Sequence, residues 1–326
     1  MKITIMGAGS WGTTLAHILA QRGHTISLWA REQKTADEIN NHHTNNTYLK
    51  KVKLESKIMA THQLADALKA AELAIIVIPS PYVRDITQKM SKHIPNTLKF
   101  IISASKGLEP STGKRMSEVI EEEIKNVPVA VLTGPNHAEE VINNIPTATV
   151  LASENKAVRE TLQKELSTPH FKVYPIEDII GAEYCGALKN VCAIAVGVSK
   201  GLHLGDNATG SIITLGLAEM ARVGAAFGAK RETYYGLAGV GDLVATCTSP
   251  HSRNLYLGEQ LAKKKTFEEI TKEMKGMVAE GANTARVLNN LAKKQNINLP
   301  LTKQVYEVIY KEKEVEKAVK DLLTVL

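Results

Sequence analysis

The chain has 326 residues, a formal net charge of +6 and a hydrophobic share of 44%, which is typical of a folded globular protein and excludes a disordered or fibrous one. Its length exceeds that of most single domains and predicts two of them. The basic balance favours anionic ligands, but the lysines are scattered and aromatic residues make up only 5%, so the composition does not indicate nucleic acid binding.

No segment is expected to carry the chain out of the cytoplasm or across a membrane. The first predicted strand begins at Lys2 and leaves no room for a signal peptide, and no run of roughly 18 apolar residues occurs. The three cysteines lack the spacing of metal ligands and are interpreted as small core residues in a reducing compartment. We therefore expect a cytoplasmic protein.

A glycine-rich turn follows the first predicted strand. The strand Lys2–Met6 leads into the hexapeptide GAGSWG at residues 7–12, and a helical pattern comes next. This G-x-G-x-x-G pattern between a strand and a helix predicts a dinucleotide site: Gly7 allows the tight turn, Gly9 lets a pyrophosphate approach the backbone, and Gly12 lets the helix pack on the strand. The N–H groups at the helix start then favour phosphate. The alternative is an ordinary strand–turn–helix corner.

The first half of the chain alternates between strand-like and helical stretches. Such alternation predicts a doubly wound, mostly parallel sheet with its ligand at the carboxyl ends of the strands. The predicted strands are Lys2–Met6, Thr25–Trp29, Leu73–Ile78, Lys99–Ser103, Val129–Leu132, Thr147–Ala152 and Phe171–Tyr174.

The end of the second predicted strand bears on the choice between NAD and NADP. An NAD site usually has an acidic residue there to bind the ribose 2′-hydroxyl, but this chain has Arg31. A guanidinium can pair with a 2′-phosphate, so NADP is admissible, while the neighbouring Glu32 leaves NAD possible. Arg31 could also be a solvated residue at a helix start.

Other loops after predicted strands also carry polar groups. Lys106 could reach an anionic substrate or a carbonyl oxygen, or be an ordinary surface lysine. The turn at Gly134 and Asn136 could present backbone N–H groups to a ligand. The Asn- and His-rich stretch 40–47 has no cysteine or carboxylate at ligand spacing, so we interpret it as a polar surface loop and not as a metal site.

The second half of the chain is helical in pattern. We expect a dinucleotide-binding domain over residues 1–177 and an all-helical substrate domain over 178–326, whose tail, 305–326, is a solvated packing helix. Within the first predicted helix, Lys189 has only small, uncharged neighbours three and four residues away. A lysine on such a face is costly unless it has a partner or a function, and burial lowers its pKa toward the range for proton transfer. The alternative is a lysine that extends to solvent at the helix edge.

Three further segments present polar side chains. Glycines surround Asp242, which predicts an acid presented from a tight turn. Ser252, Arg253 and Asn254 precede a helix, where a hydroxyl, a guanidinium and an amide make a phosphate receptor. Ser252 could also simply cap that helix. Glu280 lies in an apolar turn before another helix.

Six short motifs occur in order along the chain. They are GAGSWGT at 7–13, SKGL at 105–108, ALKN at 187–190, GVGDL at 239–243, SRN at 252–254 and VAEG at 278–281. With them, essentially the whole chain resembles the bacterial NAD(P)-dependent glycerol-3-phosphate dehydrogenases. The resemblance implies an N-terminal Rossmann domain, a helical C-terminal domain, and interconversion of dihydroxyacetone phosphate and sn-glycerol 3-phosphate for phospholipid synthesis.

The resemblance also implies a role for each matching residue. Lys189 would be the proton donor and acceptor. The implied substrate contacts are Lys106, Gly134, Asn136, Lys189, Asp242, Ser252, Arg253 and Asn254. The implied cofactor contacts are Gly7, Gly9, Ser10, Trp11, Gly12, Arg31, Lys106, Ala138, Arg253, Val278 and Glu280. The family usually has Gly-Pro-Ser-Phe-Ala where this chain has GPNHA at 134–138, so the contact of Asn136 requires an amide in place of a hydroxyl.

The expected reaction is hydride transfer between the nicotinamide of NADP or NAD and the ketone carbon of a phosphorylated triose. Lys189 would protonate the developing alkoxide, Lys106 would add positive charge, and Asp242 would orient the lysine or a substrate hydroxyl. We expect a homodimer without metal, nucleic acid or a membrane-spanning segment.

Two other functions stay open at this point. Another two-domain hydroxyacid or sugar-acid dehydrogenase would bind a carboxylate at residues 252–254. A nucleotide-sensing protein would bind the cofactor without turnover, although sensing needs no proton donor.

Overall fold

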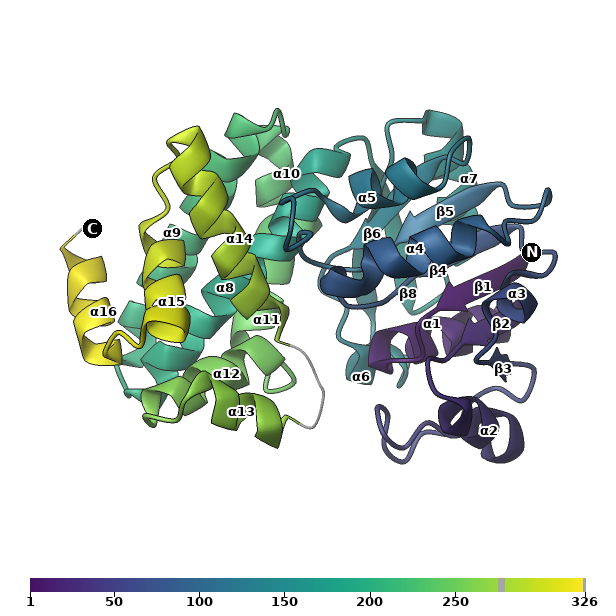
Figure 1. Ribbon diagram of the computed structural model, residues 1–326, viewed down its shortest axis with the longest axis horizontal. Helices are drawn as coiled ribbons and strands as arrows, with labels where there is room; N and C mark the ends of the chain where they lie inside the picture. Colours follow the sequence, from purple (N-terminus) through teal and green to yellow (C-terminus); the bar gives the residue numbers. More distant parts are fainter. Residues whose placement is uncertain (275–278, 325–326) are drawn as a thin grey trace. The chain divides into compact units, whose positions relative to one another are not determined.

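The computed structural model describes residues 1–274 and 279–324, which fall into two compact units (Figure 1). Unit 1 consists of Met1–Ser105 and Met116–Ile179, and unit 2 of Lys106–Arg115 and Ile180–Leu326. The short segment Lys106–Arg115 therefore belongs to unit 2, although the chain returns from it to unit 1. A single boundary after residue 177 does not describe this excursion, which leaves no mark in the local sequence pattern.

Unit 1 is built on an eight-stranded sheet in the order β3-β2-β1-β4-β5-β6-β7-β8. The pairs from β3 to β6 are parallel, β6 and β7 are antiparallel, and β7 and β8 are parallel. The strands are β1 (Lys2–Met6), β2 (Thr25–Trp29), β3 (Met59–Thr61), β4 (Leu73–Ile76), β5 (Phe100–Ser103), β6 (Val129–Thr133), β7 (Thr147–Ala152) and β8 (Phe171–Ile176). The predicted doubly wound, mostly parallel sheet is confirmed.

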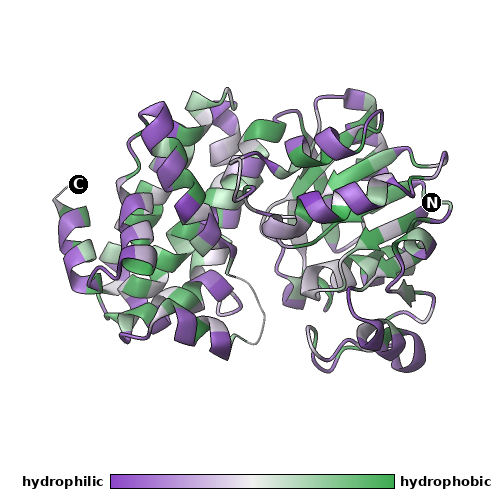
Figure 2. Ribbon diagram, viewed as in Figure 1, coloured by the Kyte–Doolittle hydropathy of each residue, from purple (hydrophilic) through white to green (hydrophobic). Residues whose placement is uncertain are grey.

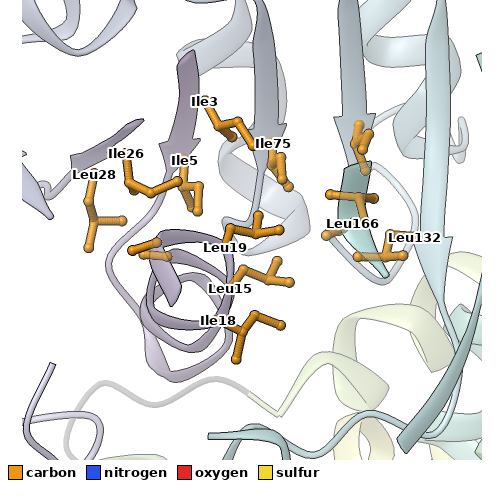
Figure 3. Close-up of a cluster of buried hydrophobic side chains, with 14 of the residues drawn as sticks. Ile3, Ile5, Leu15, Ile18, Leu19, Ile26, Leu28, Ile75, Leu132 and Leu166 are labelled. Atoms are coloured by element: carbon orange, nitrogen blue, oxygen red, sulfur yellow. The ribbon is translucent and has the colours of Figure 1, made fainter. Parts of the chain in front are cut away.

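Helices cover both faces of this sheet, because alternate side chains of each strand point to opposite sides. Ile3 and Ile5 of β1 join one buried cluster, drawn in Figure 3, whereas Met6 joins the other. Helices α1 (Ser10–Gln21), α2 (Gln33–His42), α6 (Ala138–Val141) and α7 (Lys156–Leu166) contribute to the first cluster, and α3 (Leu64–Leu68), α4 (Val83–Ser91) and α5 (Met116–Glu123) to the second. Figure 2 accordingly shows the strands mainly as hydrophobic, with hydrophilic residues on the outer helices.

The predicted strands differ from the structure mainly at β3 and β4, while β5, β6 and β8 differ by one or two residues at one end. The sequence pattern did not reveal β3, which has only three residues, one of them the exposed Met59. The fourth strand was expected to continue to Ile78 but ends at Ile76. The 3₁₀ turn Ser80–Tyr82 follows closely, and Pro79 before it cannot donate a ladder hydrogen bond, so the chain leaves the sheet early.

Unit 2 is a helical bundle around the long helix α8 (Ile179–Gly201). The helices after it are α9 (Gly205–Ala226), α10 (Arg231–Tyr235), α11 (Asp242–Thr248), α12 (Arg253–Ala262), α13 (Phe267–Glu273), α14 (Glu280–Gln295), α15 (Pro300–Lys311) and α16 (Val315–Leu323). Helix α8 is long and apolar enough to cross a membrane by length and composition, but 89% of its most apolar window is buried inside the protein. It is the central helix of the bundle. Cys185, Cys192 and Cys247 are buried and form no disulfide with one another, as expected of core residues.

The prediction of one helix over 305–326 is wrong. Helix α15 ends at Lys311, and Glu312 takes a left-handed conformation (φ 53°) before α16 begins at Val315. The Lys313 ammonium holds this break by ion pairs to Glu307 (2.6 Å) and Asp321 (2.8 Å), one on each helix. The sequence pattern attributed these charged residues to the solvent-exposed side of a single helix. In the structure they instead connect two helices.

Helices α8 and α12 cross at two glycines. A Cβ on Gly197 would lie 2.1 Å from the Leu255 carbonyl oxygen, and one on Gly258 would lie 2.0 Å from the Ile194 carbonyl oxygen. Both contacts are with backbone, which cannot move aside as a side chain can. The two helices can approach this closely only because both positions lack a side chain.

We predict that Gly258→Ala lowers the thermal unfolding midpoint, since the added methyl group must push the two backbones apart at a cost of about 1–3 kcal/mol. Gly210→Ala in α9 is the matched control. A Cβ at Gly210 would meet no described atom within 4 Å. It should therefore raise stability by roughly 0.5–1 kcal/mol through helix propensity. Scanning calorimetry checks both, and equal effects of the two substitutions would contradict the close helix crossing.

Candidate functional site

The glycine-rich turn of unit 1 needs glycine at two of its three positions. Gly7 has φ +126°, and a Cβ there would lie 2.3 Å from the Val77 carbonyl oxygen. A Cβ on Gly12 would lie 1.9 Å from the Gly7 carbonyl oxygen. At Gly9, by contrast, a Cβ would meet no described atom within 4 Å. The turn and the close helix packing therefore explain Gly7 and Gly12, and the free space next to Gly9 suits the approach of a ligand.

The surroundings of this turn fit a dinucleotide. Helix α1 begins at Ser10 with no side chain capping its first N–H groups, and β1 lies between β2 and β4, where the strand order reverses. Such a switch point, with an open helix N-terminus beside it, is where doubly wound sheets bind phosphates. In addition, the indole Nε1 of Trp11 is buried and has no hydrogen-bond partner among the described residues.

Asn45 holds the glycine-rich turn in place. Its Nδ2 donates to the Ala8 carbonyl (2.9 Å) and to Thr13 Oγ1 (2.9 Å), and the residue is fully buried. The interpretation of stretch 40–47 as a polar surface loop is therefore wrong at Asn45. An asparagine with this role cannot be told from a loop residue by local sequence, because its partners lie more than thirty positions away.

The other predicted cofactor residues are found in different settings. Arg31 is exposed at the end of β2 and pairs with Glu32 (3.1 Å). Ala138 is buried at the start of α6, and its carbonyl accepts a hydrogen bond from Thr14 Oγ1 of α1 (3.4 Å). Glu280 begins α14 in unit 2. Val278 lies outside the described residues.

Unit 2 brings together two lysines and an aspartate, which we name the lysine cluster: Lys106, Lys189 and Asp242. The Lys189 Nζ donates to Asp242 Oδ1 and to Thr246 Oγ1 (2.7 Å), and the Lys106 Nζ donates to Asp242 Oδ2 (3.0 Å). Lys189 and Asp242 are 5% and 1% exposed. Each carboxylate oxygen thus faces one ammonium group, which is what keeps a buried charge tolerable.

Each member of the cluster has a different structural origin. Lys189 lies in the middle of α8, and Lys106 begins the segment that leaves unit 1. Asp242 is the first residue of α11 and follows a π-helical turn over Leu237–Gly241. The prediction that a tight turn presents Asp242 is therefore wrong: the glycines form a wide helical turn, of a kind often found at functional sites. Thr246, one turn along α11, faces Lys189 together with Asp242.

Burial and the neighbouring charges set the protonation of the cluster. Burial is the main cause that lowers the pKa of Lys189 to about 7; the Asp242 charge opposes this shift and the Lys106 charge adds to it. Burial by itself raises the pKa of Asp242, but the charges and hydrogen bonds of the two lysines outweigh it, so this pKa lies below its usual value. Near neutral pH the carboxylate is ionised, while Lys189 can both give and take a proton.

The segment that carries Lys106 is anchored on α8. It folds back on itself through the bridge between Leu108 and Arg115, and the Glu109 N–H donates to the Lys114 carbonyl (2.9 Å). The Arg115 guanidinium then pairs with Glu183 of α8 (2.8 Å), whose side chain is 4% exposed. Because Glu183 and Lys189 share one helix, this ion pair fixes Lys106 relative to Lys189.

The predicted phosphate receptor lies at the start of α12. Ser252 caps the helix, its Oγ accepting from the Leu255 N–H (3.2 Å), so the capping alternative is confirmed. Arg253 is exposed. Asn254 is buried; its Nδ2 donates to Asn190 Oδ1 (2.9 Å) and its Oδ1 accepts from the Gly281 N–H (2.9 Å). Asn254 thus ties α12 to α14 and to the residue next to Lys189 in α8.

Gly134 and Asn136 belong to unit 1, after the end of β6. Gly134 has φ +142°, and the Asn136 Nδ2 donates to Thr149 Oγ1 (3.3 Å). The neighbouring Thr133 Oγ1 is buried and has no hydrogen-bond partner among the described residues. The amide of Asn136 therefore has a partner within unit 1, unlike the threonine hydroxyl beside it.

Sequence reasoning missed several side chains that build the site. The sequence provided no indication of a role for Thr246 except that it follows Asp242 by four residues on a helix. Asn190 stood in a quoted motif without an assigned role. Arg115 and Glu183 could not be paired in advance, because nothing in the local sequence indicates that two charges 68 positions apart meet.

Comparisons with known proteins give a consistent result. Residues 2–159 match the family described as NAD-dependent glycerol-3-phosphate dehydrogenase N-terminus, and residues 178–320 match the corresponding C-terminus. The glycerol-3-phosphate dehydrogenase [NAD(P)+] of Macrococcus caseolyticus is 40% identical over 326 residues, covering 99% of this chain and 98% of that protein. The enzyme of the same description from Enterococcus faecalis is 42% identical, covering 99% and 95%.

A solved structure is similar over the same length. The crystal structure of glycerol-3-phosphate dehydrogenase from Coxiella burnetii matches with a TM-score of 0.95 and 39% sequence identity, covering 99% of this chain and 98% of that chain.

We predict that Glu183→Gln loosens the segment that carries Lys106, because it removes the buried Glu183 carboxylate with which the partly buried Arg115 guanidinium pairs. Amide hydrogen exchange at Glu109 and Gly113, which both donate within this segment, should become faster by tenfold or more. Glu122→Gln is the control, since it removes a more exposed ion pair to Arg84 in unit 1. Unchanged exchange in Glu183→Gln would show that the ion pair does not anchor the segment.

Proposed function

The chain belongs to the NAD-dependent glycerol-3-phosphate dehydrogenase family, and on that premise we propose that it reduces dihydroxyacetone phosphate to sn-glycerol 3-phosphate and catalyses the reverse oxidation. The family uses NAD or NADP, and its product serves phospholipid synthesis. The observation that carries the proposal is the lysine cluster, because a buried lysine that titrates near neutrality is the group that a ketone reductase needs for proton transfer.

Unit 1 supplies the residues for the cofactor. The turn at Gly7, Gly9 and Gly12 and the uncapped start of α1 would hold the pyrophosphate, and Trp11 has an indole N–H without a partner among the described residues. When bound, the nicotinamide supplies or accepts the hydride. Arg31 is exposed and pairs with the neighbouring Glu32, and this surface position leaves its guanidinium accessible to a ribose 2′-phosphate.

Lys189 would move the proton. In the reducing direction its ammonium group donates from Nζ to the substrate oxygen that was the ketone carbonyl, and the neutral amine then regains a proton from water. In the oxidising direction the neutral amine takes the hydroxyl proton. Asp242 stays ionised in both directions and holds Nζ in place, together with Thr246. Lys106 adds a positive charge that stabilises the developing alkoxide.

The phosphate of the substrate would be bound at the start of α12. Arg253 offers an exposed guanidinium, and the helix N-terminus adds its N–H groups. Asn254 retains one amide hydrogen beyond the one donated to Asn190. Ser252 is already the helix cap through its acceptor oxygen, and its hydroxyl hydrogen is available for donation. The family resemblance also assigns substrate contacts to Gly134 and Asn136, and the proposal keeps them.

We also propose that the protein is cytoplasmic and that it forms a homodimer. Both follow from the family resemblance and the composition, and sedimentation of the purified protein tests the second.

The function is tested by a steady-state assay that follows the absorbance of the reduced nicotinamide. Dihydroxyacetone phosphate is compared with 2-oxo and 3-oxo acids, each with NADH and with NADPH. Oxidation that depends on dihydroxyacetone phosphate supports the proposal and gives the cofactor preference directly. Faster turnover of an oxo acid would favour a hydroxyacid dehydrogenase instead, and cofactor binding without any turnover would favour a nucleotide sensor.

We predict that Lys189→Met lowers kcat by about 10²-fold or more, because the side chain keeps its length but loses the transferable proton. Lys164→Met, a substitution at an exposed lysine of α7 in unit 1, is the control and should leave kcat unchanged. Calorimetry of cofactor binding establishes that the variant is folded. Near-normal turnover in folded Lys189→Met would rule out this lysine as the proton donor.

The pH dependence should follow the pKa of Lys189. Burial lowers it to about 7, so the ammonium form needed for reduction is lost above that pH. For dihydroxyacetone phosphate reduction, kcat/KM should therefore be level on the acid side and fall about tenfold per unit above the pKa. For glycerol 3-phosphate oxidation, which needs the neutral amine, it should rise up to the pKa and then level off. A kcat/KM for reduction that rises through this pH range, or one for oxidation that falls, would contradict the assignment.

A further inference from the structure

The buried side chain of Asn45 touches the glycine-rich turn without being part of it. Its Nδ2 donates to the Ala8 carbonyl oxygen (2.9 Å) and to Thr13 Oγ1 (2.9 Å), and both Asn45 and Thr13 are fully buried. Ala8 precedes Gly9 in the turn. Thr13 lies in the first turn of α1, and its N–H donates to the Gly9 carbonyl (2.9 Å). One amide group therefore holds the chain on both sides of Gly9.

The hydrogen bond to the Ala8 carbonyl fixes the direction of the Gly9 N–H. Every peptide bond in the described part of the chain is trans, and the C=O and N–H groups of a trans peptide point in opposite directions. Because the Ala8 carbonyl faces Asn45, the Gly9 N–H faces away from it. This N–H has no hydrogen-bond partner among the described residues, and the space beside Gly9 is open. The turn thus presents one oriented backbone donor.

Asn45 is itself firmly held. The Glu38 Oε1 of α2 accepts from Thr44 Oγ1 (2.9 Å) and from the Asn46 N–H (2.8 Å), the residues on either side of Asn45. The Asn45 carbonyl accepts from the Leu49 N–H (2.8 Å), and Leu49 belongs to the first buried cluster of unit 1. A side chain that orients a functional group needs such a fixed base, because small displacements there are passed on to the group.

The contacts of Asn45 require an amide nitrogen. The Ala8 carbonyl oxygen can only accept, so the atom opposite it must carry a hydrogen. An aspartate of the same shape would place a carboxylate oxygen against that carbonyl oxygen, in a site without water to separate them. The Asn45 Oδ1, by contrast, is buried without a partner among the described residues. A buried acceptor left unpaired is unfavourable, so the two donated hydrogen bonds are what this residue contributes.

We propose that Asn45 is a positioning residue for the cofactor: it sets the peptide between Ala8 and Gly9 so that the Gly9 N–H is directed to the pyrophosphate of the bound dinucleotide. Asn45 acts through the turn and does not itself touch the cofactor. A donor that is already oriented loses little freedom when the phosphate binds, so holding the peptide raises affinity. The inference rests on the proposed function, because it takes the glycine-rich turn as the pyrophosphate site.

The test is isothermal titration calorimetry of the intact chain with ADP-ribose, which carries the adenosine and the pyrophosphate but no nicotinamide. Asn45→Ala should weaken binding about tenfold, because the Gly9 N–H is no longer held toward the charged phosphate. Asn40→Ala is the matched control. Asn40 also makes two side-chain hydrogen bonds, but both join it to Ala60 of β3 (2.8 Å each). Its loss should lower the thermal unfolding midpoint and leave ADP-ribose binding unchanged.

A second probe separates orientation of the turn from a general loosening of unit 1. Adenosine lacks the pyrophosphate, and its binding is followed by an NMR titration of the same proteins. Asn45→Ala should bind adenosine as the wild-type protein does. In steady-state assays, the KM for the reduced cofactor should rise while kcat stays the same. Equal losses of adenosine and ADP-ribose binding would show a merely structural residue and overturn the proposal.

Glu38→Ala keeps the proposal testable if Asn45→Ala fails to fold. It removes the half-buried carboxylate that holds the neighbours of Asn45, and should weaken ADP-ribose binding about threefold. Unchanged ADP-ribose affinity in folded Asn45→Ala, or in Glu38→Ala where the first variant does not fold, would overturn the positioning role while the proposed function stands. A wild-type protein that binds no ADP-ribose would overturn the proposed function and this inference with it.

Discussion

The ion pair between Lys189 and Asp242 is the constraint on which the rest of unit 2 depends. An ammonium group in the middle of an apolar helix is unfavourable unless a carboxylate meets it, and a carboxylate buried to 1% exposure is unfavourable unless both its oxygens are paired. Lys106 supplies the second pairing. Because burial and the Lys106 charge oppose the Asp242 charge, the ammonium and amine forms of Lys189 have similar free energies near neutral pH. Proton transfer requires this property.

Helix α8 organises this arrangement, because it carries the contact residue for each of the surrounding elements. Glu183 anchors the segment of Lys106, Lys189 meets the start of α11, and Asn190 accepts from Asn254 of α12, which in turn holds α14. Glycines on α8 and α12 let these helices approach within backbone contact. The apolar composition that makes α8 resemble a membrane span therefore suits its central position in the bundle, and the burial that goes with this position lowers the pKa of Lys189.

Unit 1 shows a simpler relation between sequence and structure. The contact that requires glycine at position 12 is with Gly7 in the same turn, whereas the contact that requires it at position 7 is with the Val77 carbonyl just after β4. A long-range side-chain contact also holds the turn: Asn45 donates to the Ala8 carbonyl from a stretch that the sequence pattern assigned to a surface loop. Unit 2 carries its chemistry on side chains far apart in sequence, and for that reason its cluster depends much more on the whole fold.

The sequence by itself determined the features that are local: the alternation of strands and helices, the ends of β1, β2 and β7, the dinucleotide turn, the start of α8 and the choice of Lys189 as a candidate. Periodicity, turn chemistry and motif spacing act within a few residues, so they can be recognised without the fold. Only the tertiary structure decided the membership of Lys106–Arg115 in unit 2, the pairing of Arg115 with Glu183, the contact of Thr246 with Lys189 and the break in the C-terminal helix. These depend on groups that meet through packing, and a buried charge or hydroxyl takes whichever partner the fold brings to it.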